Sequence, residues 1–346
     1  MQPVFVIAEA GVNHNGDIAL ARQLVRIARD AGADAVKFQT FRAEDLVTLD
    51  APAAAYQTRN AGATRQFDML RQLELPEAWH AELKAYADGL GIEFFSTPFS
   101  EGAVDLLVRT GVRRLKMPSG ELTNKPLLQH AARTGLPIIL STGMGTLAEV
   151  ERAVEWIQSA RPAGFDNASG MPLCVLHCTS NYPAEPDALN LLAIQTLAGA
   201  LALPVGYSDH SEGASAAAAA VALGAVVIEK HITFDKAAPG PDHRASMTAD
   251  DFAAYVQSVR EVTRMLGDGV KAPHPSEIDT LAVARRSVVA ARPMPAGHVL
   301  VRSDLAVRRP AGGLEPAELE ALLGRTLRVP LTAGQALAWS QLTESA

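Results

Sequence analysis

The sequence contains little cysteine and no long apolar run free of charged residues. Only Cys174 and Cys178 occur among its 346 residues. They are four positions apart in one expected strand, which places their Cα atoms roughly 13 Å apart, too far for a disulfide. We therefore expect two core thiols in a reducing cytoplasm. No uncharged apolar stretch reaches the roughly 18 residues that a membrane-spanning helix needs.

Positive charge is also scarce. Lys and Arg number 31 against 38 Asp and Glu, for a formal net charge of −7, which argues against a general nucleic-acid-binding protein. The N-terminus, MQPVFVIAEAG, has no basic region before its short apolar run. We expect a first strand there and no signal peptide. The expectation is a cytoplasmic protein without membrane or nucleic-acid partners.

Two common catalytic and binding motifs are absent. No G-x-G-x-x-G follows the first apolar run, which disfavours a dinucleotide site on an open sheet. No G-x-S-x-G is present, and neither cysteine has an activating sequence context, so no nucleophilic triad is expected.

Eight short apolar runs, most of them followed by amphipathic helical sequence, are the main pattern that is present. Runs rich in Val, Ile, Leu and Phe are typical of strands buried on both faces. Their alternation with helices predicts an α/β fold, a (β/α)8 TIM barrel, with an open doubly wound sheet as the alternative. The expected strands are residues 4–11, 35–40, 92–98, 113–120, 137–143, 173–180, 204–210 and 226–233.

Two regions depart from this alternation. Residues 42–66 have no clean period, and a connection this long is typical of a lid, so we expect it over the barrel mouth. The barrel pattern covers residues 1–268, and 269–284 are expected to be a proline-containing linker. Residues 285–346 predict a small β-rich domain with strands at 285–291 and 298–307 and a helix at 316–323. About sixty residues make a domain too small to be robust alone.

The expected strands 204–210 and 226–233 each carry a histidine near the C-terminal end. Neighbouring parallel strands lie about 4.8 Å apart, so His210 and His231 can bind one metal ion. A third histidine, His243, follows in a Gly-Pro-Asp-His loop. The alternative is that each histidine bonds to the backbone at its own strand end.

Two lysines, Lys37 and Lys116, lie inside otherwise apolar strand sequence. A buried lysine without a partner is costly, so each should face an anion. Ser119–Gly120 offers a hydroxyl and a close backbone amide, which suit a phosphate or carboxylate. The alternative is pairing with a glutamate at the barrel mouth, such as Lys37 with Glu9.

These motifs together resemble the sialic acid synthase family, and the resemblance covers nearly the whole chain. The segment VRRPAGGLEP (307–316) resembles the antifreeze-like SAF domain, a β-clip, of that family. The barrel segments that carry the resemblance are IAEAGVNHNGD (7–17), AVKFQTF (35–41), FFSTPFS (94–100), LKMPSGE (115–121), STGM (141–144), HCTSNYPA (177–184), GYSDH (206–210), EKHIT (229–233) and GPDHRAS (240–246).

The resemblance implies a transferase with two small-molecule substrates. Phosphoenolpyruvate condenses with an N-acetylmannosamine-type sugar and water to give a nine-carbon 2-keto sugar acid and phosphate. Carbon 3 attacks the open-chain aldehyde, water adds at carbon 2, and phosphate leaves by C–O cleavage. The resemblance further implies Mn²⁺ or Mg²⁺ on His210 and His231, acting as a Lewis acid, and a domain-swapped homodimer.

The resemblance also implies a role for individual residues. The expected catalytic residues are Glu9, Lys37, Lys116, His210, His231 and Asp242. Phosphoenolpyruvate would bind to Lys37, Thr97, Lys116, Ser119, Ser180 and Ser208. The sugar would contact Glu9, Gln39, Tyr182, Asp242 and, from the partner subunit, Arg309.

Two motifs depart from the family pattern: Met117–Pro118 follow Lys116 where Ile-Gly or a similar pair is expected, and the segment after the sixth strand differs at Ser180. Ser180 stands where neuraminate-making members have Asn, so Ser180 or Asn181 would contact phosphoenolpyruvate. This leaves the sugar open between N-acetylmannosamine and 2,4-diacetamido-2,4,6-trideoxymannose, the legionaminate precursor. A condensing synthase for a phosphorylated sugar is an alternative that needs a further cationic cluster. A non-catalytic saccharide-binding homologue is another, which loss of Lys116 or of a metal-site histidine would favour.

Overall fold

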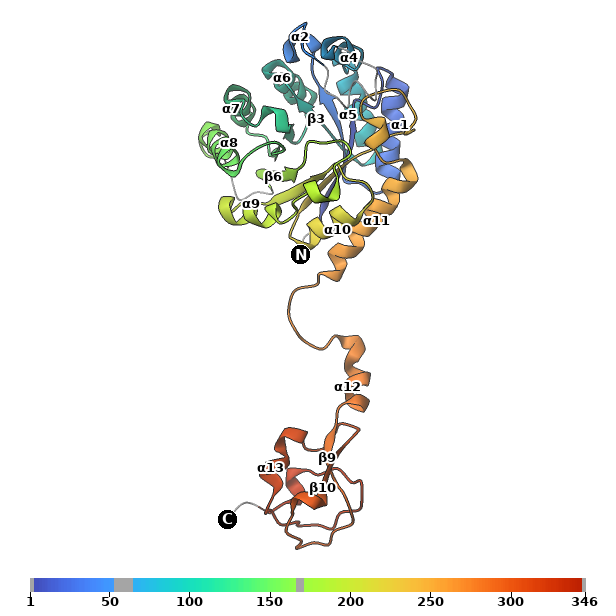
Figure 1. The fold of residues 1–346 in the computed structure, drawn as a ribbon, viewed down its shortest axis with the longest axis vertical. Coiled ribbons are helices and arrows are strands. Elements are labelled where there is room, and N and C mark those ends of the chain that lie inside the picture. The colour runs from blue at the N-terminus through green and yellow to red at the C-terminus, as the bar shows by residue number, and fades with distance from the viewer. Residues whose placement is uncertain (1–2, 53–64, 166–170, 344–346) are drawn as a thin grey trace. The chain divides into compact units, whose positions relative to one another are not determined.

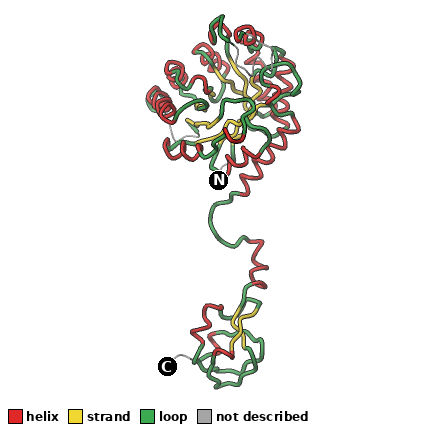
Figure 2. Tube along the Cα trace, viewed as in Figure 1, coloured by secondary structure: helices red, strands yellow, loops and turns green. Residues whose placement is uncertain are grey.

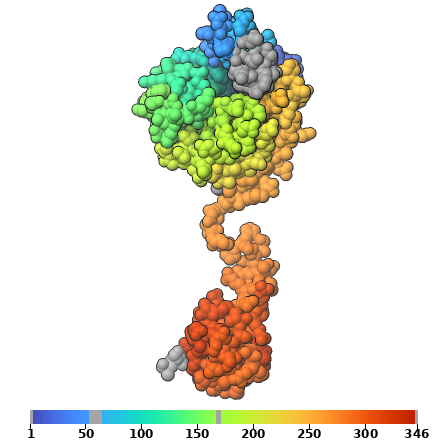
Figure 3. Space-filling model, viewed as in Figure 1, coloured from blue at the N-terminus to red at the C-terminus, as the bar shows by residue number. Residues whose placement is uncertain are grey.

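The chain folds into two compact units, Met1–Asp268 and Gly269–Ala346 (Figure 1). The structure, a computed structural model, describes residues 3–52, 65–165 and 171–343. Residues 53–64, about half of the predicted lid at 42–66, therefore lie outside the described residues. Figure 3 shows the chain in a space-filling view.

The first unit is an eight-stranded parallel barrel, as the sequence predicts. The strand order is β3-β2-β1-β8-β7-β6-β5-β4, and β3 and β4 at the ends of this order also lie next to each other. All eight predicted runs form strands. Their bounds are β1 Phe5–Gly11, β2 Ala35–Thr40, β3 Glu93–Pro98, β4 Leu115–Met117, β5 Ile138–Ser141, β6 Leu173–Cys178, β7 Val205–Asp209 and β8 Val227–His231.

Helices form the outer layer around these strands (Figure 2). Side chains cap several of them: Asp17 accepts from the amide of Ala19 at the start of α1, and Ser100 accepts from that of Ala103 in α6. Such caps satisfy amides that the first helical turn leaves unpaired. The helices are α1 Ile18–Asp30, α2 Ala43–Leu46, α4 Gln66–Gln72, α5 Glu77–Leu90, α6 Glu101–Thr110, α7 Lys125–Arg133, α8 Leu147–Ala160, α9 Ala193–Leu201, α10 Ser215–Ala222 and α11 Ala249–Met265.

The strand register positions the candidate site. Glu9 in β1 lies opposite Lys37 of β2 and also opposite His231 of β8. All three side chains are buried. Because alternate residues of a strand face the same side, Lys37 and Gln39 both face the barrel mouth, as do Glu229 and His231. A register irregularity between Glu9 and Gly11 shifts the β1–β2 pairing at that mouth, so that Gly11 lies opposite Phe38.

The second unit contains a two-stranded antiparallel sheet, β9 Ser287–Ala290 and β10 Leu305–Arg308. Helix α12 (Ile278–Ala284) occupies the second half of the predicted linker. The predicted helix at 316–323 is a 3-10 turn, Pro316–Glu318, followed by the short helix α13 (Leu319–Leu322). The core consists of Val288, Ala290, Met294, Leu300, Leu305, Leu319, Leu322, Leu327, Leu331, Leu337 and Leu342.

The predicted strand at 298–307 is wrong over most of its length. Only its end belongs to β10, because Asp304 folds the preceding residues into a turn. Its buried carboxylate accepts hydrogen bonds from the Val301 amide at 3.0 Å, from Arg292 at 2.7 Å and from His298 at 2.7 Å. Residues Arg302–Asp304 form a 3-10 turn there.

The two cysteines are core thiols, as the sequence predicts. Cys174 and Cys178 are both free and buried. Among the described residues, no helix is long and apolar enough to cross a membrane.

Candidate active site

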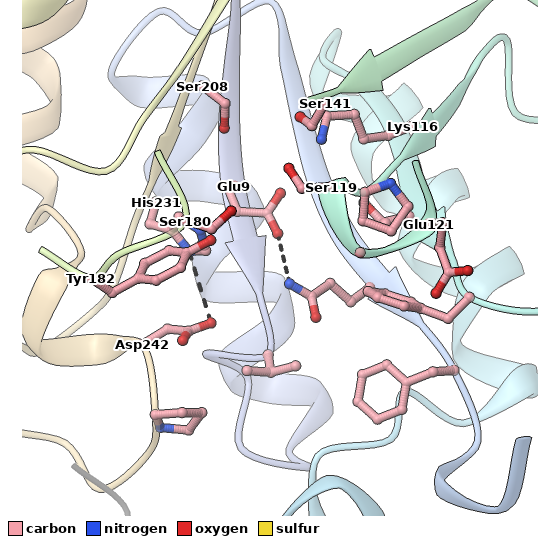
Figure 4. A pocket seen from close by; sticks show the side chains of 18 of the residues that line it. Glu9, Lys116, Ser119, Glu121, Ser141, Ser180, Tyr182, Ser208, His231 and Asp242 are labelled. Atoms are coloured by element: carbon pink, nitrogen blue, oxygen red, sulfur yellow. Dashed lines mark hydrogen bonds and ion pairs between the residues drawn. The ribbon is translucent and has the colours of Figure 1, made fainter. Parts of the chain in front are cut away.

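A pocket of about 600 Å³ opens at the C-terminal ends of the barrel strands (Figure 4). In the close-up, Glu9, Tyr182, His231 and Asp242 gather on one side, and Lys116, Ser119 and Ser141 on the other. The pocket collects every predicted barrel site residue: Glu9, Lys37, Gln39, Thr97, Lys116, Ser119, Ser180, Tyr182, Ser208, His210, His231 and Asp242. Arg309 is exposed in the second unit, after β10.

The floor of the pocket holds two lysines and two glutamates, which we call the inner network: Glu9, Lys37, Lys116 and Glu229. Lys37 forms an ion pair with Glu9, lies 3.6 Å from a Glu229 oxygen, and donates to the Thr97 hydroxyl at 2.9 Å. Lys116 lies 3.4 Å from the other Glu229 oxygen. Lys37 therefore pairs with Glu9, as the pairing alternative predicts, and both ammonium groups also line the pocket.

Burial and charge act against each other in the inner network. Burial would raise the pKa of Glu229, but Lys116 and Lys37 outweigh it and hold that pKa at about 2. Burial would lower the pKa of Lys37, but Glu229 and Glu9 raise it. Burial, with Lys37 nearby, lowers the pKa of Lys116 despite Glu229. Lys116 is thus the less well compensated lysine, and an added anion would compensate it.

Hydroxyl groups surround the lysine end of the pocket. Ser119 Oγ accepts from the Gly143 amide at 3.0 Å and lies 3.2 Å from Cys178 Sγ. A Cβ at Gly143 would fall 2.2 Å from Ser180 Oγ and 2.9 Å from Ser119 Oγ, so only glycine lets these groups converge. Ser180 lines the pocket, whereas Asn181 is exposed and its side chain accepts from the Tyr182 amide.

The two predicted metal-site histidines face each other across the β7 and β8 ends. Their ring centroids are 5.6 Å apart, and the Tyr182 ring lies 4.1 Å from that of His210. Burial lowers the pKa of His210 to about 4 and that of His231 well below its usual value. Both rings are therefore neutral at pH 7, the state in which imidazole binds metals.

The protonation of His210 follows from its contacts. Nδ1 lies 2.6 Å from the carbonyl oxygen of Thr179, which can only accept, so Nδ1 carries the proton and Nε2 keeps its lone pair. In His231 the buried Nδ1 has no hydrogen-bond partner among the described residues and lies 4.0 Å from an Asp242 oxygen. This donor set fits a divalent cation. No group of three or more His, Cys, Asp or Glu residues converges on one point in the described chain.

His243 does not contribute to this pair. Its Nδ1 lies 2.7 Å from Thr233 Oγ1 and its Nε2 3.1 Å from Asn15 Oδ1. A Cβ at Gly240 would fall 2.7 Å from the His243 ring. His243 thus orders the loop that places Asp242 in the pocket. Burial, reinforced by the Glu9 carboxylate, raises the pKa of Asp242 to about 7.

One side of the pocket is apolar, and we call it the apolar wall: Val12, Phe41, Leu46, Val47, Met69, Leu70, Leu73 and Phe99. Helices α2 and α4 supply Leu46, Met69 and Leu70, and Val47 and Leu73 directly follow these two helices. Among the described residues that line the pocket, Lys37 and Lys116 are the only lysine or arginine side chains, and neither belongs to this wall.

Comparison with known proteins places this architecture in a family. The profile of the NeuB family matches residues 24–271, and that of the SAF domain matches residues 285–343. This chain belongs to the NeuB family.

Relatives within the NeuB family bear several names. The chain is 47% identical to the N,N'-diacetyllegionaminic acid synthase of Legionella pneumophila over 98% of this chain and 94% of that protein. It is 34% identical to human N-acetylneuraminate-9-phosphate synthase over 94% and 89% of the two chains. The crystal structure of N-acetylneuraminic acid synthetase from Leptospira borgpetersenii, in complex with citrate, is 35% identical with a TM-score of 0.70, over 81% of this chain and 90% of that one.

The sequence places three further polar residues at strand ends facing the pocket, Ser141, Glu121 and Glu229, but it predicts no individual role for any of them, and Glu229 is the most important of the three. Glu229 contacts both lysines and accepts from Ser208 Oγ at 2.8 Å. The sequence signal that could have assigned Glu229 to the site is its position two residues before His231, which places both side chains on the same face of the strand. Glu121 follows Ser119–Gly120 in a 3-10 turn, which no strand or helix pattern predicts.

Proposed function

We propose that this protein condenses phosphoenolpyruvate with 2,4-diacetamido-2,4,6-trideoxymannose and water, giving a nine-carbon legionaminate-type 2-keto acid and phosphate. The observation that carries the proposal is a single pocket in which two buried lysines, several hydroxyls and two neutral histidines converge. It combines an anion site with a metal site at the strand ends where barrel enzymes place their chemistry.

The anion end of the pocket suits phosphoenolpyruvate. Lys37 and Lys116 supply two positive charges, and Thr97, Ser119, Ser180 and Ser208 supply hydroxyl donors around them. Charge-assisted hydrogen bonds of this kind are the strong ones. Glu9 and Glu229 hold both lysines in place, so the site need not reorganise when a carboxylate and a phosphate bind.

His210 and His231 would hold the divalent ion, Mn²⁺ or Mg²⁺. When bound, such an ion supplies Lewis-acid activation of the sugar aldehyde. The backbone bond at His210 Nδ1 directs Nε2 toward the pocket's ligand, in the way that outer partners orient metal-binding imidazoles. Tyr182 packs against both rings and limits their rotation.

The residues around Glu9 would manage the sugar and the water. Gln39 donates to Glu9 at 3.2 Å, which holds both side chains at the mouth of the pocket. Asp242 faces the same space from the β8 loop. In the reaction carbon 3 bonds to the aldehyde carbon, the new alkoxide takes up a proton, and water loses a proton as it adds at carbon 2. The resulting carbon 2 hydroxyl then loses its proton and becomes the keto oxygen as phosphate departs with its bridging oxygen. Glu9 and Asp242 are the carboxyl groups placed to carry those protons.

The apolar wall supports the choice of sugar. The trideoxy sugar carries a methyl group at carbon 6 and a second acetamido methyl, whereas N-acetylmannosamine carries hydroxyls at carbons 4 and 6. A wall of Leu, Met, Phe and Val side chains matches methyl groups better than it matches hydroxyl groups. The Legionella relative, named for legionaminate, is also more similar than the human one.

A phosphorylated sugar fits the described pocket less well. The human relative is named for a 9-phosphate product, and a sugar phosphate needs a cation near its far end. In the described part of the pocket no lysine or arginine lies on the apolar wall. A purely saccharide-binding role is disfavoured because Lys116, His210 and His231 are all present.

The test is a coupled assay of phosphate release with phosphoenolpyruvate and each sugar in turn. We expect kcat/KM for the diacetamido-trideoxy sugar to exceed that for N-acetylmannosamine by at least tenfold, because an apolar contact per methyl contributes about 1 kcal/mol. Equal or reversed preference would reject the sugar assignment and leave the reaction class in place. No phosphate release with either sugar would reject the reaction.

We further propose that the protein acts as a homodimer in which Arg309 reaches the sugar of the partner barrel. Arg309 is an exposed arginine directly after β10. The second unit has a small core of its own, and such a unit gains stability by packing on a larger one.

A further inference from the structure

A second buried charge cluster lies directly behind the two histidines, on the opposite face of the same strands. Asp209 of β7 and Lys230 of β8 are register partners, and each is 1% exposed. Each immediately precedes a metal-site histidine in the sequence. Because successive residues of a strand face opposite sides, Asp209 and Lys230 point outward, away from the pocket.

Helix α11 completes this cluster with Tyr255, which is fully buried. The Tyr255 hydroxyl donates to Asp209 Oδ2 at 2.9 Å, and Lys230 Nζ lies 3.4 Å from the same oxygen. The ammonium group also lies 5.7 Å from the centre of the Tyr255 ring. We call Asp209, Ser211, Lys230 and Tyr255 the outer network.

Ser211 connects the outer network to the backbone on the far side of His210. Its amide and its hydroxyl donate to Asp209 Oδ1 at 2.9 and 2.6 Å, and its carbonyl accepts from Lys230. The His210 carbonyl itself accepts from the Ala184 amide at 2.8 Å. Hydrogen bonds therefore hold Asp209, His210 and Ser211 in place. The same set of bonds reaches Lys230, the residue that precedes His231.

We propose that the outer network positions His210 and His231 for the divalent ion. A buried ion pair is a poor device for stability alone, since apolar replacements of similar volume are often neutral or stabilising. It does, however, fix geometry, because both charges lose their partners if either strand shifts. None of its four residues lines the pocket, so the network acts through the histidines. This inference rests on the proposed metal site.

The test is the affinity of the metal-free protein for Mn²⁺, measured by calorimetry or by the electron paramagnetic resonance of free Mn²⁺, together with the thermal midpoint. Tyr255→Phe removes one hydrogen bond and keeps the ring. The double variant Asp209→Asn with Lys230→Met removes both charges, so neither is left buried alone. Loss of groups that orient metal ligands typically costs 10- to 100-fold in affinity. We expect about tenfold weaker Mn²⁺ binding in Tyr255→Phe and up to about a hundredfold in the double variant.

The matched control is Arg260→Met on the same helix. Arg260 pairs with Asp34 at 2.7 Å, at the end of the barrel where β2 begins, opposite the pocket. This variant should lower the thermal midpoint and leave Mn²⁺ affinity within about twofold of the parent. If the double variant does not fold, the Mn²⁺ affinity of Tyr255→Phe alone still tests the proposal.

Three outcomes have distinct meanings. Weaker Mn²⁺ binding in the outer-network variants but not in Arg260→Met supports positioning. Unchanged Mn²⁺ binding in folded Tyr255→Phe and in the folded double variant overturns the inference and leaves the metal site standing. A parent protein that binds no divalent cation overturns the metal site and this inference with it.

Discussion

The inner and outer networks are two sets of buried charges on opposite faces of the barrel strands, and only β8 contributes to both, through Glu229 and Lys230. In the outer network every side chain has a hydrogen-bonding or charged partner. Around the pocket, the buried Ser141 Oγ and His231 Nδ1 have none among the described residues. Buried polar atoms are normally paired. The unpaired atoms of Ser141 and His231, both of which line the pocket, therefore mark positions where a ligand would complete the hydrogen bonding.

The largest expected effect comes from the inner face at His210. His210→Ala should lose divalent metal and reduce turnover to background, because one remaining imidazole cannot hold the ion in place. Metal content and phosphate release measure the two losses. Chelation of the parent protein should abolish turnover and Mn²⁺ should restore it. The control His130→Ala changes a partly exposed histidine on α7 that does not line the pocket. Full activity in a metal-free preparation would contradict the assignment.

Removing a lysine of the inner network should cost less than removing the metal. Lys37→Ala and Lys116→Ala each leave carboxylate or phosphate charge uncompensated, a loss of ~3–5 kcal/mol, hence on the order of a hundredfold or more in kcat/KM for phosphoenolpyruvate. Arg22→Ala breaks only an exposed ion pair with Glu82 and should be neutral. Near-normal kcat/KM in both lysine variants, with the fold intact, would reject the anion site.

Arg309 differs from the charges of both networks because its side chain is exposed within its own unit. Arg309→Ala should raise KM for the sugar more than for phosphoenolpyruvate, by about tenfold, while the neighbouring exposed Arg308→Ala should change neither. Mixing Arg309→Ala with His210→Ala protein should restore activity after subunit exchange, since one pocket then has both groups. Absence of recovery despite verified exchange would show that Arg309 does not act in trans.

Asp304 is a fully satisfied charge, like the outer network, and should affect stability without affecting catalysis. Burial would raise its pKa, but hydrogen bonds from His298, the Val301 amide and Arg292 outweigh it and hold the pKa at about 2. The folded pKa lies below the unfolded value near 3.9, so the stabilisation is present above that value and is lost as the pH falls through about 2.

The measurement for Asp304 is urea unfolding between pH 5 and 2, followed by Trp339 fluorescence in a Trp79→Phe, Trp156→Phe background. Asp304→Asn should be less stable at pH 5 and should lose less of its stability on acidification. A parallel decline in both proteins would show that Asp304 is not the titrating group. This effect is the smallest of the four because it concerns one carboxylate of the second unit.

The sequence predicted the barrel well because its signals are local. Runs such as IEFFSTP and PIILSTG are buried on both faces, and they became β3 and β5. The same logic placed His210 and His231 at neighbouring strand ends. Local pattern misled at 298–307, where the Asp304 side chain overrides the strand propensity of its apolar neighbours.

Other features depend on residues far apart in the chain. Tyr255 donates a hydrogen bond to Asp209 across 46 positions of sequence, and neither local segment contains a pattern that predicts this contact. The contact of Glu229 with two lysines from different strands likewise depends on barrel closure. The apolar wall forms from several loops and helices whose separate segments have no common period.

The place of β1 between β2 and β8 has a consequence for synthesis on the ribosome. The first strand cannot gain its second neighbour until β8 is made, and at 5–20 residues per second that delay is on the order of tens of seconds. During this interval one edge of β1 carries unpaired backbone groups, a known template for aggregation. Glu9 lies on that strand and is hydrated while the edge is open. The pocket therefore assembles last, when the two ends of the barrel sequence meet.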